Sequence, residues 1–487
     1  MSRVKTARGA EVGDLKMSLM DVARGAYVRS PEVVRRSLAP LISLVPTRLK
    51  FGGSYRKWRE RIALASADPA YADAQHLASL RAIVGRAHAL SPFYRELIER
   101  TFGSNFDATT FELSDLQRLP ILRKEELRQA GEAVLTVPRG EADRGDTSGS
   151  NGERPFTFYL DKDRSAREMA FVYDNWSRIG FTEQTGKIVL RGFGLHPRGT
   201  SISQWEPALR ELRLSVFPMT HDDVRTYLDL IDRHELEYLY GYPSAIELMC
   251  RHMCRIGRMP KRPLKGILPI SEPLYPHQRR IISAVFGEVP IANFYGLSEK
   301  VLFAKEISSD GFYQFDPLYG LAELVDEAGR PITEIGREGR LVGTGFTGIS
   351  MPFLRYDTED RATLVEPATA GNGQRLTVER LTPRRKPDFL ISSDGNRVVT
   401  IDFTPENPRY FEGIEEYQFF QDRPGHSTIR YIPTADGSEA DALRVANGLT
   451  QRTHGKIVFA VEQVERLAGG RAGKRAFIDQ RLDISKY

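Results

Sequence analysis

Residues 147–152, Thr-Ser-Gly-Ser-Asn-Gly, bring small polar side chains and glycines together in one short segment. Glycine lets a chain turn tightly, so several backbone N–H groups and hydroxyls can converge on a phosphate. No Gly-Lys-Ser/Thr sequence follows and no helix is expected to begin there, so the segment is not a Walker A loop. The segment therefore suggests a phosphate-binding loop, and an ordinary Ser/Gly turn is the alternative.

A second segment, Asn293–Glu299, directly follows an apolar stretch and carries an amide, an aromatic ring and a carboxylate. The ring of Tyr295 could stack on a nucleobase, and the amide of Asn293 could bond to the edge of the base. The carboxylate of Glu299 could hold Mg²⁺, which prefers oxygen ligands. For Glu299 alone, an ordinary surface acid is the alternative.

Two further segments offer groups that nucleotides need. Arg355–Asp360 holds three acids in six residues, and in the turn expected there Asp360 could accept hydrogen bonds from a ribose diol. Lys474 follows the glycine-rich stretch Gly469–Gly473, from which a lysine can reach a phosphate as a point charge. A solvated acidic turn and a surface lysine are the respective alternatives.

The middle of the chain predicts the elements that position these segments. From Pro155 to Gly296, short apolar runs alternate with stretches of helical periodicity, which indicates a largely parallel sheet with helical crossovers. The expected strands are residues 156–160, 188–190, 238–240, 267–270 and 289–294. Ligands of such sheets bind in loops at the carboxyl ends of the strands.

The pattern changes after Phe312 to short strands separated by turns, which predicts a β-rich subdomain. From about Asp388 onward, a hairpin at Asp394-Gly395, two strands, a helix and a last strand predict a separate α+β domain. We therefore expect an α/β protein with mixed sheets, a β-rich subdomain and a small, mobile C-terminal domain.

The order and separation of these motifs resemble the adenylate-forming superfamily. Within it the chain is most similar to the phenylacetate–CoA ligase-like family, in the branch named for capsular polysaccharide biosynthesis (CapK-like). The resemblance extends from about Leu80 to the end of the chain. It is carried by the segments already described and by Leu90–Tyr94, Leu119–Glu125, Gly241–Ala245, Ser271–Leu274, Tyr295–Lys300 and Met351–Tyr356.

We expect three parts. The local charge predicts a basic helical segment at residues 1–76, and the resemblance implies a large ATP- and acyl-binding domain at 77–384 and a small lid domain at 385–487. The resemblance also implies the nucleotide-binding residues. These are Ser148, Gly149, Ser150, Asn151, Gly152, Ser271, Glu272, Pro273, Asn293, Tyr295, Gly296, Ser298, Asp360 and Arg385.

By the same resemblance, Lys474 and Glu299 are the catalytic residues, and Glu299 is the Mg²⁺ ligand. Asp388 is a candidate hinge. The substrate pocket is expected at Tyr242, Pro243 and Ser244, with Phe193–His196 and Ser271–Pro273 around it.

The chain departs from the family pattern at several positions. Asn151 replaces the usual threonine of the phosphate loop, and Glu359 replaces the usual glycine before Asp360. Lys386-Pro387 stiffens the hinge region. Many relatives carry a cysteine cluster between the ribose-binding turn and the hinge, but Arg361–Arg384 contains no cysteine, so no zinc is expected.

The resemblance implies an ATP-dependent ligase that activates a small-molecule carboxylic acid as an acyl-adenylate, with ATP and Mg²⁺ as cofactors. The acyl group then passes to coenzyme A, or to an amine or hydroxyl acceptor in surface polysaccharide biosynthesis. The alternative is a degenerate ligase fold that acts as a non-catalytic scaffold at the membrane surface. Homodimers occur among relatives, so a homodimer is one open possibility.

Composition limits the remaining function classes. The chain has 487 residues, a net charge of +5 and two cysteines, without a long apolar run, which predicts a cytoplasmic protein. Arg29–Arg61 holds nine Lys/Arg against two acids. This basic segment predicts either peripheral contact with the inner face of an anionic membrane or a helix pair packed on the main body. No aromatic–basic module accompanies it, so nucleic acid is not an expected partner.

Overall fold

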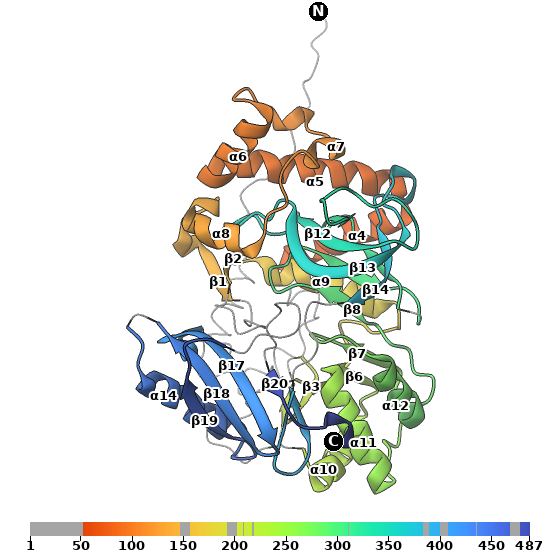
Figure 1. Ribbon diagram of the computed structural model, residues 1–487. Coiled ribbons are helices and arrows are strands. Elements are labelled where there is room, and N and C mark those ends of the chain that lie inside the picture. The colour runs from red at the N-terminus through yellow and green to blue at the C-terminus, as the bar shows by residue number, and fades with distance from the viewer. Residues whose placement is uncertain are drawn as a thin grey trace, which may run out of the picture.

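A computed structural model describes most of the chain, and Figure 1 shows its layers. A helical layer lies at the top, an antiparallel sheet below it, a largely parallel sheet at the lower right and a C-terminal lobe at the lower left. The described residues are 52–146, 156–191, 202–207, 209–216, 219–309, 311–382, 389–399, 408–434, 436–467 and 478–487.

The helical layer is built from elements with clear local stop and start signals. Ser91 ends α5 and its hydroxyl accepts from Tyr94 N at the start of α6, so one serine caps both helices. Helix α5 begins at Pro69, after the cap Asp68, whose side chain accepts from Ala70 N. The helices are α4 (Gly52–Ala67), α5 (Pro69–Leu90), α6 (Pro92–Phe102), α7 (Leu113–Leu116) and α8 (Lys124–Ala130).

Helix α4, the described end of the basic segment, packs on the main body. Tyr55 and Ile62 are each 1% exposed, and the Tyr55 hydroxyl donates to Glu183. Arg59 pairs with Asp174 at 2.8 Å. This part of the segment therefore follows the packing alternative, while residues 29–51 lie outside the description and membrane contact stays a prediction. The predicted division between residues 76 and 77 also stays a prediction, and α5 runs across it.

A hairpin and a long helix follow the helical layer. The hairpin strands β1 (Ala142–Asp146) and β2 (Thr157–Asp161) pair antiparallel, and α9 (Arg164–Ser177) begins after them. The strand predicted at 156–160 is present with a shift of one residue, but it belongs to this antiparallel hairpin and not to the parallel sheet in which it was expected. Residues 147–155 join the two strands and lie outside the description.

The predicted parallel sheet is present, in the order β4-β5-β3-β6-β7. Strands β5, β3, β6 and β7 run parallel, and every residue of β3, β6 and β7 is buried, as expected for a sheet covered on both faces. Its elements are β3 (Lys187–Leu190), β4 (Ser203–Glu206), β5 (Glu211–Leu214), α10 (His221–His234), β6 (Tyr238–Gly241), α11 (Pro243–Ile256), β7 (Gly266–Pro269) and α12 (Pro276–Phe286).

The prediction of one continuous strand over residues 289–294 is wrong. Only Ile291 bridges to β7, at Ile267, and the regular strand β8 begins at Phe294 and pairs antiparallel with β9 in the other sheet. That sheet has the order β11-β12-β13-β14-β10-β9-β8, with antiparallel pairs throughout. Its strands are β8 (Phe294–Gly296), β9 (Phe303–Glu306), β10 (Tyr313–Phe315), β11 (Gly320–Val325), β12 (Glu338–Gly345), β13 (Tyr356–Glu366) and β14 (Thr377–Thr382).

The C-terminal lobe has a core of its own, with Leu390, Phe419 and Ile429 fully buried in it. The predicted hairpin is present, and Gly395 takes a φ of 80° at its turn. The elements are β15 (Phe389–Ile391), β16 (Arg397–Val399), β17 (Ile414–Arg423), β18 (His426–Pro433), α14 (Glu439–Arg452), β19 (Val458–Gln463) and β20 (Ile478–Gln480). Among the described residues, no helix has both the length and the apolarity of a membrane span.

Candidate functional site

Two of the predicted motifs meet through Tyr295 and Asp360. Tyr295 lies on β8, and its hydroxyl donates to Asp360 Oδ2 on β13 at 2.6 Å, across 65 residues of sequence. Tyr295 is 9% exposed and Asp360 is 6% exposed. Burial, followed by the Asp360 carboxylate, raises the pKa of Tyr295 well above its ordinary value, so the phenol remains a donor.

Glu299 lies beside this contact and is not a surface acid. It is 5% exposed, and the hydroxyl of Tyr356 donates to its Oε1 at 2.8 Å. Burial and the Glu299 carboxylate raise the pKa of Tyr356 well above its ordinary value. We call Tyr295, Glu299, Tyr356 and Asp360 the buried centre.

The segment that carries Asp360 is a strand with a bulge, not the turn expected from the sequence. The register of β12 and β13 shifts between Arg340 and Val342, and Thr358 Oγ1 donates to the Leu341 carbonyl at 2.7 Å. Bulges redirect side chains in this way. At 6% exposure Asp360 does not belong to a solvated acidic turn.

The same bulge explains why Glu359 is an unusual residue at its position. Glu359 has a φ of 64°, in the left-handed region that favours glycine. Such a backbone costs on the order of 1–3 kcal/mol and persists where neighbours fix it. Here Asp357 accepts from the Glu359 N–H at 2.9 Å, and Lys124 pairs with its carboxylate at 3.2 Å.

Lys124 is a site residue that reasoning from the sequence missed. Its Nζ lies 4.0 Å from Glu299 Oε1, between that acid and Glu359. The lysine is held there because Leu122 joins the edge of β13, donating its N–H to the Arg355 carbonyl and accepting from Asp357 N, each at 2.9 Å. The available signal was the matched stretch Leu119–Glu125, which ends one residue after the lysine.

The other residues of the Asn293–Glu299 segment differ in exposure. Asn293 is 3% exposed, and its side-chain NH₂ donates to the Tyr313 hydroxyl at 2.8 Å. The ring of Tyr295 meets Phe315 edge-on at 5.9 Å between centroids. Gly296 and Ser298 are exposed. The expected contacts of these residues with adenine stay predictions.

A second polar contact joins the carboxyl ends of β6 and β7. The Glu272 carboxylate accepts from Ser244 N at 3.0 Å and from Ser244 Oγ at 2.9 Å. Ser244 lies in the first turn of α11, after Tyr242 at the N-cap and Pro243 at the first helical position. The carboxylate thus satisfies a free N–H at the positive end of the helix. We call Ser244 and Glu272 the edge pair.

The edge pair borders a cavity of about 400 Å³ between this region and the C-terminal lobe. Tyr275 and Pro273 contribute on one side, and Phe389 and Arg397 on the other. The Arg397 guanidinium lies over the Phe389 ring at 4.7 Å. The expected pocket residue Ser244 therefore does line a cavity, whereas Ser271 is exposed and has a φ of 65°.

Several expected site residues lie outside the described residues, and their roles stay predictions. They are Ser148, Gly149, Ser150, Asn151, Gly152, Phe193–His196, Arg385, Asp388 and Lys474.

The Glu299 carboxylate suits a hard cation that takes its remaining ligands from water and phosphate. Among the described residues, the Tyr356 hydroxyl donates to Glu299 Oε1. Within the described ranges, no group of three or more His, Cys, Asp or Glu side chains is arranged for a metal ion. A Mg²⁺ ion held by one carboxylate and a nucleotide is a common arrangement, and Glu299 fits it.

Comparison with known proteins supports the motif-based resemblance. No protein-family model matches the chain. The chain is 21% identical over 393 residues to Protein CapK of Staphylococcus aureus, covering 80% of this chain and 84% of that protein. The predicted resemblance to the CapK-like branch is thereby confirmed.

Solved structures give the fold. The chain matches 2-hydroxyisobutyryl-CoA ligase in complex with 2-HIB-AMP and CoA in the thioesterification state, with a TM-score of 0.52 and 18% identity over 84% of this chain and 90% of that chain. An open conformation of the same ligase matches with a TM-score of 0.48 and 18% identity over 83% and 91% of the two chains. The predicted fold class, that of the adenylate-forming ligases, is confirmed by the first match.

Proposed function

We propose that this protein is an adenylate-forming ligase that activates a carboxylic acid with ATP and then transfers the acyl group to an acceptor. The observation that carries the proposal is the buried centre, in which segments of distant sequence converge on two carboxylates with their phenol donors. Buried carboxylates held by matched donors are a feature of functional sites. The CapK relative and the shared ligase fold support the same activity.

The residues of the buried centre divide into two roles. Asp360 would accept hydrogen bonds from the ribose hydroxyls, and the neighbouring Tyr295 and Asn293 would contact adenine. Glu299 would face the phosphates and hold Mg²⁺, which when bound offsets the negative charge of ATP. Lys124, 4.0 Å from Glu299, adds a fixed positive charge on the same side.

In the first half-reaction, a carboxylate oxygen of the substrate attacks the α-phosphorus, and the bond from that phosphorus to pyrophosphate breaks. Positioning and charge stabilisation provide most of the acceleration in such phosphoryl chemistry. Lys474 would supply one of these charges, and residues 148–152 would supply backbone donors to the phosphates.

In the second half-reaction, the acceptor attacks the acyl carbon and AMP leaves. The cavity beside the edge pair offers room for the acceptor, because it opens between the sheet edge and the C-terminal lobe. The acceptor would be coenzyme A, which accompanies the solved ligase, or an amine or hydroxyl of a surface polysaccharide precursor, which the resemblance to the capsule branch leaves equally open.

The decisive experiment is a pyrophosphate-release assay with a panel of carboxylic acids, followed by mass spectrometry of the acyl-AMP. Release with at least one acid, together with its adenylate, is expected. No release with any acid, in protein that binds neither ATP nor AMP, would instead support a non-catalytic scaffold. The panel should be repeated with and without coenzyme A to separate thioester formation from transfer to an amine or hydroxyl.

A further inference from the structure

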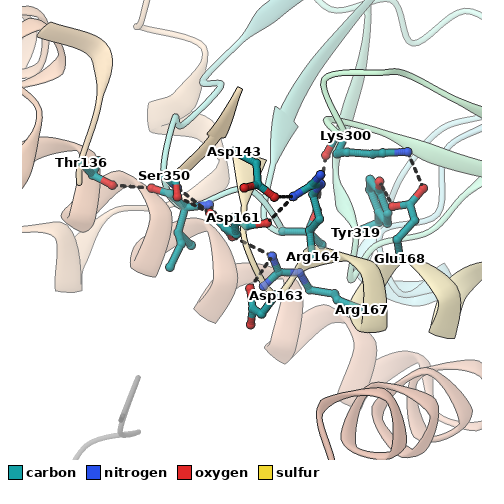
Figure 2. Close-up of polar contacts among 12 residues, drawn as sticks. Thr136, Asp143, Asp161, Asp163, Arg164, Arg167, Glu168, Lys300, Tyr319 and Ser350 are labelled. Atoms are coloured by element: carbon teal, nitrogen blue, oxygen red, sulfur yellow. Dashed lines mark hydrogen bonds and ion pairs between the residues drawn. The ribbon is translucent and has the colours of Figure 1, made fainter. Parts of the chain in front are cut away.

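Helix α9 reaches three separate segments through charged side chains in its first half (Figure 2). Arg164 donates to Asp143 on β1 and to the Asp161 carbonyl on β2. Arg167 pairs with the Asp161 carboxylate at 2.7 Å. Glu168 accepts hydrogen bonds from Lys300, in the loop between β8 and β9, and from Tyr319, just before β11. The helix therefore links the β1–β2 hairpin to loops of the sheet that carries the buried centre.

The Asp161 carboxylate extends this link to the loop before β13. It accepts from Ser350 N at 2.8 Å, Ser350 Oγ at 2.6 Å and Ile349 N at 3.2 Å. Asp161 is only 5% exposed, and Figure 2 shows it between Arg167 and Ser350. The loop it holds leads directly into Tyr356, the residue that donates to Glu299.

Glu168 makes the second link, to the residue after Glu299. Its Oε1 accepts from Lys300 Nζ at 2.9 Å, and its Oε2 accepts from the Tyr319 hydroxyl at 2.6 Å. Lys300 has a φ of 61°, an unfavourable backbone for a residue with a long side chain. Thr347 Oγ1 also donates to the Lys300 carbonyl at 3.3 Å. Side-chain contacts thus hold the Lys300 backbone in the left-handed region, which a lysine rarely adopts by itself.

We propose that Glu168 is a positioning residue: through Lys300 it fixes the backbone that aims the Glu299 carboxylate into the site. The inference rests on the proposed function, because it assigns Glu299 to the phosphate side of bound ATP. Glu168 touches neither the carboxylate nor the reacting atoms, and acts only through the adjacent residue. Loss of the ion pair would let residues 297–300 relax, and Glu299 would turn away from its partner Tyr356.

The nucleoside half of the site is expected to be independent of Glu168. Tyr295 is fixed by pairing of β8 with β9, and Asp360 by the bulge of β13. AMP, which lacks the β- and γ-phosphates, should therefore bind normally when Glu168 is changed. This separation gives a readout that a general loss of stability would not produce.

Asp174 provides a matched control on the same helix. Its carboxylate accepts from Lys305 Nζ at 2.6 Å and pairs with Arg59, and its side chain is 20% exposed against 21% for Glu168. Lys305 lies on β9 and is not adjacent to the acid at 299. Asp174→Asn therefore removes a similar ion pair without touching the proposed link.

The experiment compares wild type, Glu168→Gln and Asp174→Asn by calorimetric titration with ATP·Mg²⁺ and with AMP, and by thermal unfolding. Glu168→Gln should weaken ATP binding on the order of tenfold while AMP binding stays within about twofold, since a displacement near 1 Å has effects of this size or larger. Asp174→Asn should leave both affinities within about twofold at a comparable loss of thermal stability. Lys300→Met, which breaks the same ion pair from the other side, should reproduce the Glu168→Gln pattern and serves if that variant does not fold.

Equal weakening of ATP and AMP by Glu168→Gln, or the same pattern in Asp174→Asn, would overturn the positioning role while leaving the proposed function intact. Unchanged ATP affinity in both Glu168→Gln and Lys300→Met would overturn it too. A wild-type protein that binds neither nucleotide would overturn the proposed function, and this inference with it.

Discussion

The buried centre and the edge pair are built from similar groups but in different ways. In the buried centre, hydrogen bonds join residues 57 and 65 positions apart, and each acid is 5–6% exposed. In the edge pair, Glu272 contacts a residue 28 positions away and remains partly exposed beside a cavity. The two strands of the first are fixed by sheet pairing, whereas the cavity beside the second is bordered on one side by the C-terminal lobe.

This difference suggests a division of labour within the proposed reaction. A site whose side chains are held before the ligand arrives loses little free energy in ordering them, which suits a constant substrate such as ATP. A cavity between two parts of the chain can differ in shape with the position of the lobe, which suits a second substrate. The predictions below test the division, in order of expected effect.

The largest effect is expected at Lys474, a residue of the predicted lid domain that would supply a positive charge to the adenylation reaction. Lys474→Ala should slow adenylate formation by about 10²–10³, the usual result of removing one preorganised charge from a transition state. Transfer from a supplied acyl-adenylate should continue. The measurement is pyrophosphate release beside single-turnover transfer, with Arg475→Ala as the control. Equal loss in both half-reactions would contradict a role in adenylation alone.

Glu299→Gln should come next, with a loss of about 10² in adenylation, because the neutral amide no longer offsets charge at the phosphates. The amide keeps the shape of the side chain, and its oxygen can still accept from Tyr356. Folding should therefore be intact by circular dichroism, and AMP should still bind. Wild-type pyrophosphate release by this variant would reject the assignment of Glu299.

Strands could be predicted from the sequence, but the setting of the site residues could not, and the reason is physical. Strands β3, β6 and β7 were predicted because a strand buried on both faces is a continuous apolar run, whatever its partners. Tyr295 and Asp360 were identified by motif, but their setting was not. Whether a residue lies in a turn or in a bulged strand depends on the partner strand, and here β12 imposes the bulge.

Contacts between distant segments could not be predicted from the sequence either, because strand pairing creates them. Tyr356 lies in the segment Arg355–Asp360, where only the acids were predicted to take part in chemistry, so its role was missed. Its value appears only when β13 brings the phenol within 2.8 Å of Glu299. Lys124 likewise acquires a role through one bridge between Leu122 and β13. By contrast, Glu359 was correctly noted as unusual, and its φ of 64° shows why glycine suits that position.

Asp360→Asn tests whether the buried centre recognises the nucleoside. The variant loses the charge that would accept from the ribose hydroxyls. A hydrogen bond to a charged group contributes about 1.5–3 kcal/mol, or roughly tenfold or more in affinity. Both AMP and ATP should weaken together, unlike the pattern expected from Glu299→Gln. Calorimetric titration of the two nucleotides checks this, and a selective loss of ATP would place Asp360 on the phosphate side instead.

Glu272→Gln should have the smallest effect and should separate the two regions most cleanly. The carboxylate accepts from the Ser244 N–H and hydroxyl in the first turn of α11, and glutamine keeps one of the two accepting oxygens. The loss should therefore stay below about 1 kcal/mol, and the melting temperature should fall only slightly. Because Glu272 lies at the cavity, the KM of the acceptor should rise in the transfer assay while nucleotide affinity stays unchanged. A loss of AMP affinity would instead support the nucleotide-binding role that the resemblance implies for Glu272. Ser244→Ala is the matched control, since it removes the hydroxyl's hydrogen bond to Glu272 but leaves the carboxylate and its contact with the backbone N–H in place. If Ser244→Ala lowers the melting temperature without changing the acceptor KM, the Glu272 charge itself faces the acceptor; if either variant weakens AMP, the division between the buried centre and the edge pair is wrong.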